Sequence, residues 1–207
     1  ERSGGATVDG FTVQAMASLP HAHELIIGVH RDQVFGPTVL FVAAPVALAL
    51  GIGDLAGAFP LAAVTGELSG FADRAMDAAI TDAIRRRVPD AEPAGFIALA
   101  LGKHGARELN YSSDIDPILL YDPETLPRRE RDEPGDAAQR IARTVVETLA
   151  RVTEEGYVFR IDLRLRPASE VSPLAISVDA ALSHYESSAL AWERAAFIRA
   201  RACAGDI

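Results

Sequence analysis

Hydrophobic residues follow two different patterns along the chain, and the change comes near residue 45. Before it, short apolar runs separated by glycine, proline and aspartate predict a small β-meander, with strands at residues 11–16, 23–30 and 38–43. After it, alanine-rich stretches with apolar residues three or four positions apart predict helices. We therefore expect three parts: a β fragment at 1–44, a helical lead-in at 45–94 and an α/β domain at 95–207.

The helical lead-in contains a long amphipathic repeat. Ser69 is expected to cap the N-terminus of a helix. This helix is expected to end at Arg87, because three successive arginines there suit the negative end of the helix dipole. The apolar residues that recur at helical spacing are Phe71, Ala75, Met76, Ala79, Ile80, Ala83 and Ile84. Upstream, residues 33–53 carry no charge, as a membrane span would, but glycines and prolines interrupt them. A buried strand that leads into a helix is the favoured interpretation of that run.

The last part alternates apolar strands with amphipathic helices. Phe96–Leu101 is a continuous apolar run between glycines, which predicts a strand buried on both faces. Further strands are expected at 117–121 and 157–165, and helices at 136–153, 178–187 and 190–202. The predicted fold class is therefore α/β (α+β), with flanking helices and a short β-meander in front.

Three aspartates are the strongest candidates for chemistry. Asp114 and Asp116 are two residues apart, so in an extended segment both carboxylates lie on one face. Asp162 lies in the apolar strand predicted at 157–165, where a charge needs a partner. Three such carboxylates can hold one or two Mg²⁺ ions, whose exchangeable waters give way to phosphate oxygens. The arrangement predicts metal-dependent displacement at the phosphorus of a nucleotide.

Each aspartate also has a purely structural interpretation. Ser112, Ser113 and Asp114 are good turn formers, so the first pair is also suited to capping a turn. Asp162 is also suited to an ion pair with Arg164. Metal binding is the favoured interpretation for all three carboxylates.

Four nearby side chains are candidates to bind phosphate. Arg164 and Arg166 share a face of the predicted strand with Asp162, and they suit either phosphate binding or neutralisation of the acidic cluster. Lys103, beside a glycine turn, suits either a phosphate or the solvent. Ser113 suits a phosphate hydrogen bond and turn capping equally well.

Charge and cysteine content limit the classes of partner and the compartment that we expect for this chain. Asp and Glu number 29 against 20 Lys and Arg, and the net charge of −9 leaves no general electrostatic footprint for nucleic acid. Cys203 is the single cysteine and cannot form an internal disulfide, so a reducing cytoplasm is expected. His21, His23 and His30 are expected to be exposed strand residues rather than metal ligands. Neither a signal peptide nor a membrane partner is expected.

Several long stretches carry a resemblance to a known family: Gly102-Lys103, Gly105, Arg107 to Asp116, Glu155 to Pro167 and Trp192 to Arg201. On these residues, the chain from about Ala47 to its end resembles the glutamine synthetase adenylyltransferase family. The resemblance implies a DNA polymerase β-like nucleotidyltransferase domain at 95–207 with an incomplete C-terminus. Asp114, Asp116 and Asp162 would hold Mg²⁺, and the turn at Gly102 and Gly105 would place a phosphate. The implied partners are glutamine synthetase, ATP or ADP, phosphate and a PII-type regulator of nitrogen metabolism.

Asn110 bears on the direction of the reaction. The N-terminal head of these two-headed enzymes reads Glu-Leu-Asn before its Ser-Asp-x-Asp, as this chain does. That head removes AMP from a tyrosine of adenylylated glutamine synthetase by phosphorolysis, which releases ADP. His104 stands where the family usually has Leu, and Ala106 where it has Gly or Ser, so weaker phosphate binding is expected. The alternatives are a catalytically silent module that binds nucleotide or glutamine synthetase, and an enzyme that transfers AMP from ATP.

Residues 9–41 carry a second resemblance. Asp9 to Met16 and His23 to Phe41 are similar to part of the ATP-grasp domain of ADP-forming acyl-CoA synthetases. Ala15 stands where that family has a Glu that meets the adenine, and the family's phosphate-binding lysines are missing, so ATP-grasp catalysis is not expected. The junction near Ala43 to Val46 fits a natural fusion, an engineered chimera or a mis-joined reading frame.

Overall fold

The chain folds around a mixed four-stranded sheet with the strand order β5-β4-β3-β6. The structure is a computed structural model that describes residues 30–32, 36–38, 43–153 and 156–207. β3 (Phe96–Leu101) pairs antiparallel with β4 (Asp116–Tyr121) and with β6 (Arg201–Gly205). β5 (Ala175–Ser177) pairs parallel with β4. The predicted mixture of strands and helices is confirmed at this level.

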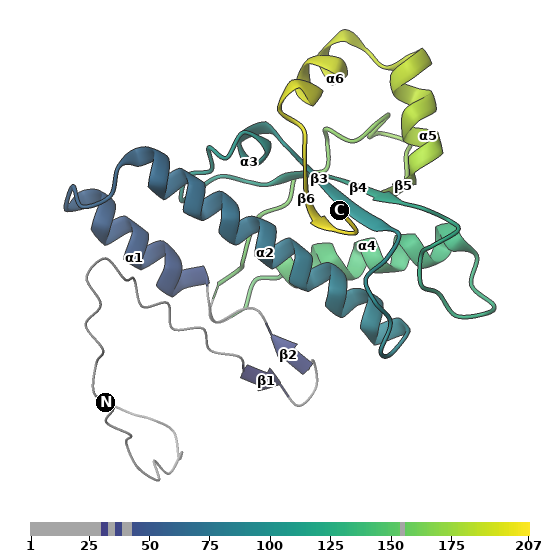
Figure 1. Cartoon of the computed structure of the whole chain (residues 1–207), viewed down its shortest axis with the longest axis horizontal. Coiled ribbons are helices and arrows are strands. Elements are labelled where there is room, and N and C mark those ends of the chain that lie inside the picture. Colours follow the sequence, from purple (N-terminus) through teal and green to yellow (C-terminus); the bar gives the residue numbers. More distant parts are fainter. Residues whose placement is uncertain (1–29, 33–35, 39–42, 154–155) are drawn as a thin grey trace.

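Two long helices cover one face of the sheet (Figure 1). α2 (Leu61–Arg87) packs against β6, α4 (Pro134–Ala150) packs against β5, and the two helices pack against each other. The apolar residues predicted for α2 are all buried, because their helical spacing gathers them on the side that faces the sheet. From β3, alternate residues Phe96, Ala98 and Ala100 enter the same core.

α1 (Ala43–Leu55) precedes α2 and packs against it. α2 lies within the predicted helical lead-in and shares one hydrophobic core with the sheet, whereas α1 begins at Ala43, two residues before the predicted start of the lead-in. The division of the chain at residues 45 and 95 stays a prediction.

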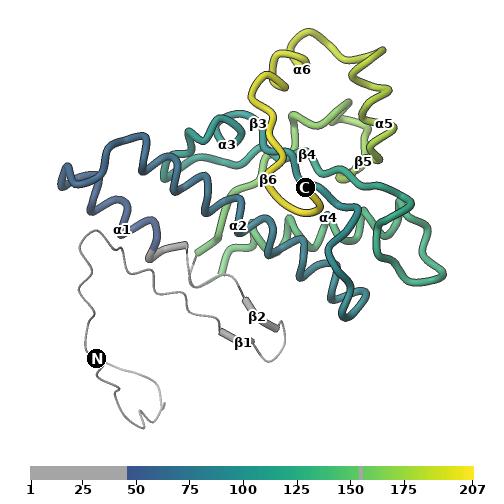
Figure 2. Tube along the Cα trace, in the orientation of Figure 1, coloured from purple at the N-terminus to yellow at the C-terminus, as the bar shows by residue number. Residues whose placement is uncertain are grey.

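Short elements occupy the connections near the sheet (Figures 1 and 2). α3 (Gly102–Gly105) follows β3 without a gap. α5 (Val178–Ser183), a π-helical turn at His184–Ser188, α6 (Ala191–Ala196) and a 3-10 turn at Phe197–Arg199 lie between β5 and β6. The chain then returns through β6 along the free edge of β3.

Several boundaries differ from the sequence prediction, and three of these differences are large. α2 begins at Leu61 rather than Ser69, and the buried Ser69 hydroxyl donates to the Thr65 carbonyl at 2.8 Å within the helix. The helix predicted at 190–202 ends early, because Arg201–Gly205 forms β6, which pairs with β3 along the edge that β4 leaves open and satisfies the backbone hydrogen bonds there. The strand predicted at 157–165 is reduced to an isolated parallel bridge at Ile161.

The N-terminal prediction is tested over a few residues. β1 (His30–Asp32) and β2 (Gly36–Thr38) pair antiparallel, with His30 opposite Thr38. The strand predicted at 11–16 and most of the other two, with His21 and His23, lie outside the described residues. Within the described part of the chain, no helix has the length and hydrophobicity needed to cross a membrane.

Candidate active site

The three predicted aspartates come together because two segments far apart in sequence pair beside β4. Ile115 donates its N–H to the Arg160 carbonyl at 3.0 Å, and Asp162 donates its N–H to the Ile115 carbonyl at 2.9 Å. Ile115 is fully buried and Ile161 packs against the same core. Since side chains alternate along extended segments, Asp114, Asp116 and Asp162 lie on the opposite face, away from α2 and α4.

Asp116 is the half-buried centre of this acidic face. Among the described residues, its carboxylate has neither a hydrogen bond nor an ion pair. Burial raises the pKa of Asp116, and the charges of Asp162 and Asp114 raise this pKa further. A carboxylate that is partly desolvated and repelled by two others is suited to a cation, and its oxygen donors fit Mg²⁺.

The other two carboxylates are paired with arginines in this structure. Asp114 accepts a hydrogen bond from Arg160 Nε, and Arg160 also donates to the Ser112 carbonyl. Asp162 accepts from the Arg164 N–H at 2.9 Å and from its guanidinium. The hydrogen bond from Arg164 lowers the pKa of Asp162. The ion pair considered as the structural alternative for Asp162 is therefore present, and its Arg164 side chain is 85% exposed.

The glycine turn borders the acidic face. Gly102 has φ +55°, which favours glycine, and a Cβ there would lie 2.7 Å from Asp116 Oδ2. A Cβ at Gly105 would lie 1.9 Å from the Arg199 carbonyl oxygen. Both positions therefore require glycine, because a side chain would clash with the Asp116 carboxylate at Gly102 and with the main chain of Arg199 at Gly105. Lys103, between them, is exposed.

Two of the predicted phosphate ligands have other partners. Ser113 Oγ donates to Asn110 Oδ1 at 2.9 Å and accepts from the Asn110 N–H at 3.1 Å, so it caps a turn. The Arg166 guanidinium donates to four main-chain carbonyls, those of Leu163, Ser169, Ser172 and Pro173.

Arg166 is not on one face with Asp162, contrary to the prediction. The chain turns at Arg164 because the Asp162 side chain accepts that residue's N–H, which ends the extended segment.

Sequence reasoning assigned no role to Arg160, Asp73 or Arg201. Arg160 is two residues before Asp162, and this spacing on one face was the available signal. Asp73 interrupts the apolar repeat of α2, and Arg201 ends a motif that was recognised as a whole. Their partners come from distant segments, which residue spacing does not reveal.

A second group of potential metal ligands lies next to the glycine turn. Ligand atoms of Asp73, His104 and Cys203 fall within 4.8 Å of one another. Asp73 already accepts hydrogen bonds from Arg201 at 2.8 and 2.9 Å, and His104 Nε2 lies 2.7 Å from its Oδ1. Burial, followed by the charge of Asp73, raises the pKa of Cys203 to about 12. A paired carboxylate and a protonated thiol are poor metal ligands, so we interpret Asp73 and His104 as members of a hydrogen-bonded network with Arg201.

Comparisons with known proteins agree with the motifs at this site. Residues 40–207 match the family described as glutamate-ammonia ligase adenylyltransferase, and residues 1–60 match an ATP-grasp domain. Similar curated proteins are named bifunctional glutamine synthetase adenylyltransferase/adenylyl-removing enzymes. The one from Caulobacter vibrioides is 49% identical over 170 residues, which are 77% of this chain and 17% of the relative. The one from Xanthobacter autotrophicus is 45% identical over 172 residues, which are 78% of this chain and 17% of the relative.

A relative from a Bradyrhizobium species is 38% identical over 213 residues, which are 93% of this chain and 22% of the relative. The chain thus spans about a fifth or less of the length of these relatives. The family match covers most of the chain, including the acidic face and the glycine turn. The chain belongs to the glutamate-ammonia ligase adenylyltransferase family.

Proposed function

We propose that this chain is a deadenylylating module, which removes AMP from a tyrosine of glutamine synthetase with inorganic phosphate as the nucleophile. The observation that carries the proposal is the Asp116 carboxylate, which has no partner in the part of the chain that the structure describes and lies on one face with Asp114 and Asp162, beside Gly102. The connection β3–turn–β4, with the acidic pair where β4 begins, also supports a DNA polymerase β-like fold.

The acidic face supplies the ligands for the proposed Mg²⁺. Asp116, Asp114 and Asp162 would bind the cation together. For this, Asp114 and Asp162 would release the arginines with which they are paired and bind the cation instead. When bound, Mg²⁺ supplies positive charge that stabilises the phosphate oxygens during the displacement. Asp116 gains most from this binding, because its repulsion by the other two carboxylates is relieved.

In the proposed reaction, a phosphate oxygen forms a bond to the phosphorus of the AMP group. The bond between that phosphorus and the tyrosine oxygen breaks, the tyrosine takes up a proton, and ADP leaves. Arg164 and Arg160, freed from their carboxylates, would bind the phosphate oxygens on which negative charge develops. The Gly102–Gly105 turn, next to Asp116, would let the main chain approach the phosphate. Lys103 is exposed at this turn and would add a positive charge.

The direction of transfer rests on the Glu-Leu-Asn sequence that ends at Asn110, which resembles the deadenylylating head. The relatives are named for both activities, so transfer of AMP from ATP to glutamine synthetase is the second candidate. A PII-type regulator stays a prediction, since no described residue identifies its surface.

A silent module is the third candidate, and Ala106 favours it. The Ala106 N–H donates to the Gly102 carbonyl at 3.2 Å inside the turn, so this amide is already used. A Ser at this position would have added a hydroxyl donor for phosphate.

The test is to mix the purified chain with adenylylated glutamine synthetase, Mg²⁺ and phosphate and to measure ADP. We expect ADP release by the wild type and none by Asp114→Asn. The matched control is Asp82→Asn, which removes an ion pair with Arg86 on α2 and should retain activity.

The alternatives give different results in the same assay. Incorporation of AMP from ATP into unmodified glutamine synthetase, with no ADP release from phosphate, would establish the adenylylating direction. If neither reaction occurs in a chain that unfolds cooperatively, the silent module is correct. ADP release by Asp114→Asn at the wild-type rate would overturn the metal-ligand assignment.

A further inference from the structure

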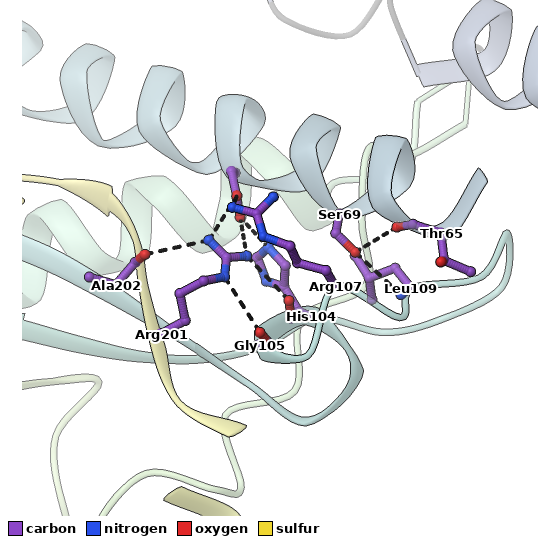
Figure 3. A network of polar contacts seen from close by, with 9 residues as sticks. Thr65, Ser69, His104, Gly105, Arg107, Leu109, Arg201 and Ala202 are labelled. Atoms are coloured by element: carbon purple, nitrogen blue, oxygen red, sulfur yellow. Dashed lines mark hydrogen bonds and ion pairs between the residues drawn. The ribbon is translucent and has the colours of Figure 1, made fainter. Parts of the chain in front are cut away.

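A partly buried network of hydrogen bonds joins the glycine turn to two other elements (Figure 3). Asp73 comes from α2, His104 from α3 and Arg201 from the first position of β6. His104 is fully buried, and its Nε2 carries the hydrogen toward Asp73, because a carboxylate only accepts. The network therefore joins segments that are 31 and 128 residues from Asp73 in the sequence.

Arg201 binds the carboxylate and the turn at the same time. Its two terminal nitrogens donate to the two oxygens of Asp73, at 2.8 and 2.9 Å. The same guanidinium donates to the His104 carbonyl at 3.2 Å and to the Gly105 carbonyl at 3.4 Å. The planar guanidinium suits this task, because its five donors have fixed directions.

Asp73 keeps its charge in this setting. Burial by itself would raise the pKa of Asp73, but hydrogen bonds from His104 and Arg201 outweigh burial and hold the pKa below its ordinary value. Asp73 is therefore ionised at neutral pH, as a bidentate pair with arginine requires.

The far end of the turn is close to Asp116. The Gly102 Cα hydrogens face Asp116 Oδ2, since a Cβ built there would lie 2.7 Å from that oxygen. Gly105 packs against the Arg199 carbonyl, just before β6. The turn thus lies between the network on one side and the acidic face on the other.

We propose that Asp73 and Arg201 are positioning residues, which hold the Gly102–Gly105 turn at the distance from Asp116 that the reacting phosphate requires. The inference rests on the proposed function for its catalytic consequence. Neither residue touches the acidic face. They act through the two carbonyls and the imidazole of the turn.

The test compares Asp73→Asn and Arg201→Lys in the full chain. Asp73→Asn keeps the size of the side chain but removes the charge that orients Arg201. Arg201→Lys keeps the charge but loses the fork that spans Asp73 and the two carbonyls. The readouts are hydrogen exchange of the amides from Gly102 to Glu108, and kcat and KM for phosphate in ADP release.

Three control variants accompany these changes. Asp82→Asn and Arg86→Lys alter an exposed ion pair on the same helix, with Asp82 about 13 Å along α2 from Asp73. Asp77→Ala removes the carboxylate that accepts the Gly205 N–H at 3.0 Å, and so loosens the contact between α2 and β6 without touching the turn.

We expect both network variants to speed exchange at the turn by about tenfold and to raise the KM for phosphate by a similar factor, with a smaller change in kcat. The controls should leave the turn and the KM unchanged. Exchange that stays at the wild-type rate, or that rises equally in α2, β6 and the turn, would overturn the inference. So would an unchanged KM in a variant whose turn exchanges faster.

The exchange readout does not need turnover, so the two proposals fail separately. If the wild type releases no ADP but the two network variants still exchange faster at the turn, the proposed function is refuted and the positioning role of Asp73 and Arg201 is supported. A wild type that releases ADP while the variants keep its KM and its exchange would refute the inference alone.

Discussion

Replacing Asp116 by Asn should stabilise the metal-free protein. Its carboxylate has no hydrogen bond or ion pair among the described residues, and the preceding residue, Ile115, forms a parallel bridge with Ile161, the residue before Asp162. Like charges in such cross-strand positions cost about 0.2–1 kcal/mol per pair, and Asp114 adds a weaker repulsion. We expect a gain of about 1 kcal/mol at pH 7, which corresponds to an increase in Tm of about 2–4 °C for a chain of this size.

The pH dependence of stability tests in a second way whether Asp116→Asn stabilises the protein. The folded-state pKa of Asp116 is raised above its unfolded value, so ionisation favours the unfolded state. The associated stability is present below the unfolded pKa and is lost as the pH rises through the folded pKa. The advantage of Asp116→Asn should therefore be largest at neutral pH and should disappear below about pH 4.

Thermal unfolding in EDTA and in Mg²⁺ measures both effects. At ten times its Kd, Mg²⁺ should stabilise the wild type by about 1.4 kcal/mol and the variant much less, so the order of the two proteins reverses. Asp162→Asn is the internal control, because Asp162 has Arg164 as a partner and should gain nothing in EDTA. A lower Tm for Asp116→Asn in EDTA, or equal stabilisation of both proteins by Mg²⁺, would refute the reasoning.

Three further predictions follow from single contacts. Asp114→Asn and Asp162→Asn should abolish ADP release while changing the unfolding free energy by less than about 1 kcal/mol, because each breaks a solvent-exposed ion pair; urea titration and the ADP assay check this. Gly105→Ala should destabilise the chain by about 2 kcal/mol or more in urea titration, because its Cβ would lie 1.9 Å from the Arg199 carbonyl oxygen; wild-type stability would contradict this packing. Asp73 has a lowered pKa, so its contribution to stability is complete above its unfolded pKa and is lost as the pH falls through the folded value; urea midpoints measured from pH 5 to pH 2 should decline less in Asp73→Asn than in the wild type.

The main elements of the fold were predictable where the pattern was strong and local. Phe96–Leu101 forms a strand with the predicted boundaries, and the apolar face of α2 is buried as its spacing indicated. The prediction was wrong at 157–165, expected as a strand, and at residues 201–202, expected as the end of a helix. In the first segment the Asp162 side chain accepts a hydrogen bond from the Arg164 N–H, which ends the extended backbone, and in the second the open edge of β3 outweighs helix propensity.

The candidate site was predictable in composition but not in pairing. The spacing of Asp114 and Asp116 predicted their common face, and the flanking motif led to the family that the comparisons show. The ion pair of Asp162 with Arg164 was one of the two interpretations that the sequence offered, and it is present. The ion pair of Asp114 with Arg160 and the other partners of Arg166 required the structure. Whether these aspartates hold metal stays a prediction that the experiments above test.

The sequence by itself determined which faces of its segments are apolar, where glycine is required and which family the chain resembles. These properties depend on the identity and spacing of neighbouring residues, which the backbone period converts directly into a face. The tertiary structure alone decided that Ile161 meets Ile115, which leaves Asp116 beside Asp162 without a partner among the described residues, and that Arg201 reaches Asp73 next to the turn. Such contacts depend on which distant segments pack together, and the periodicity of a single segment carries no information about its partner.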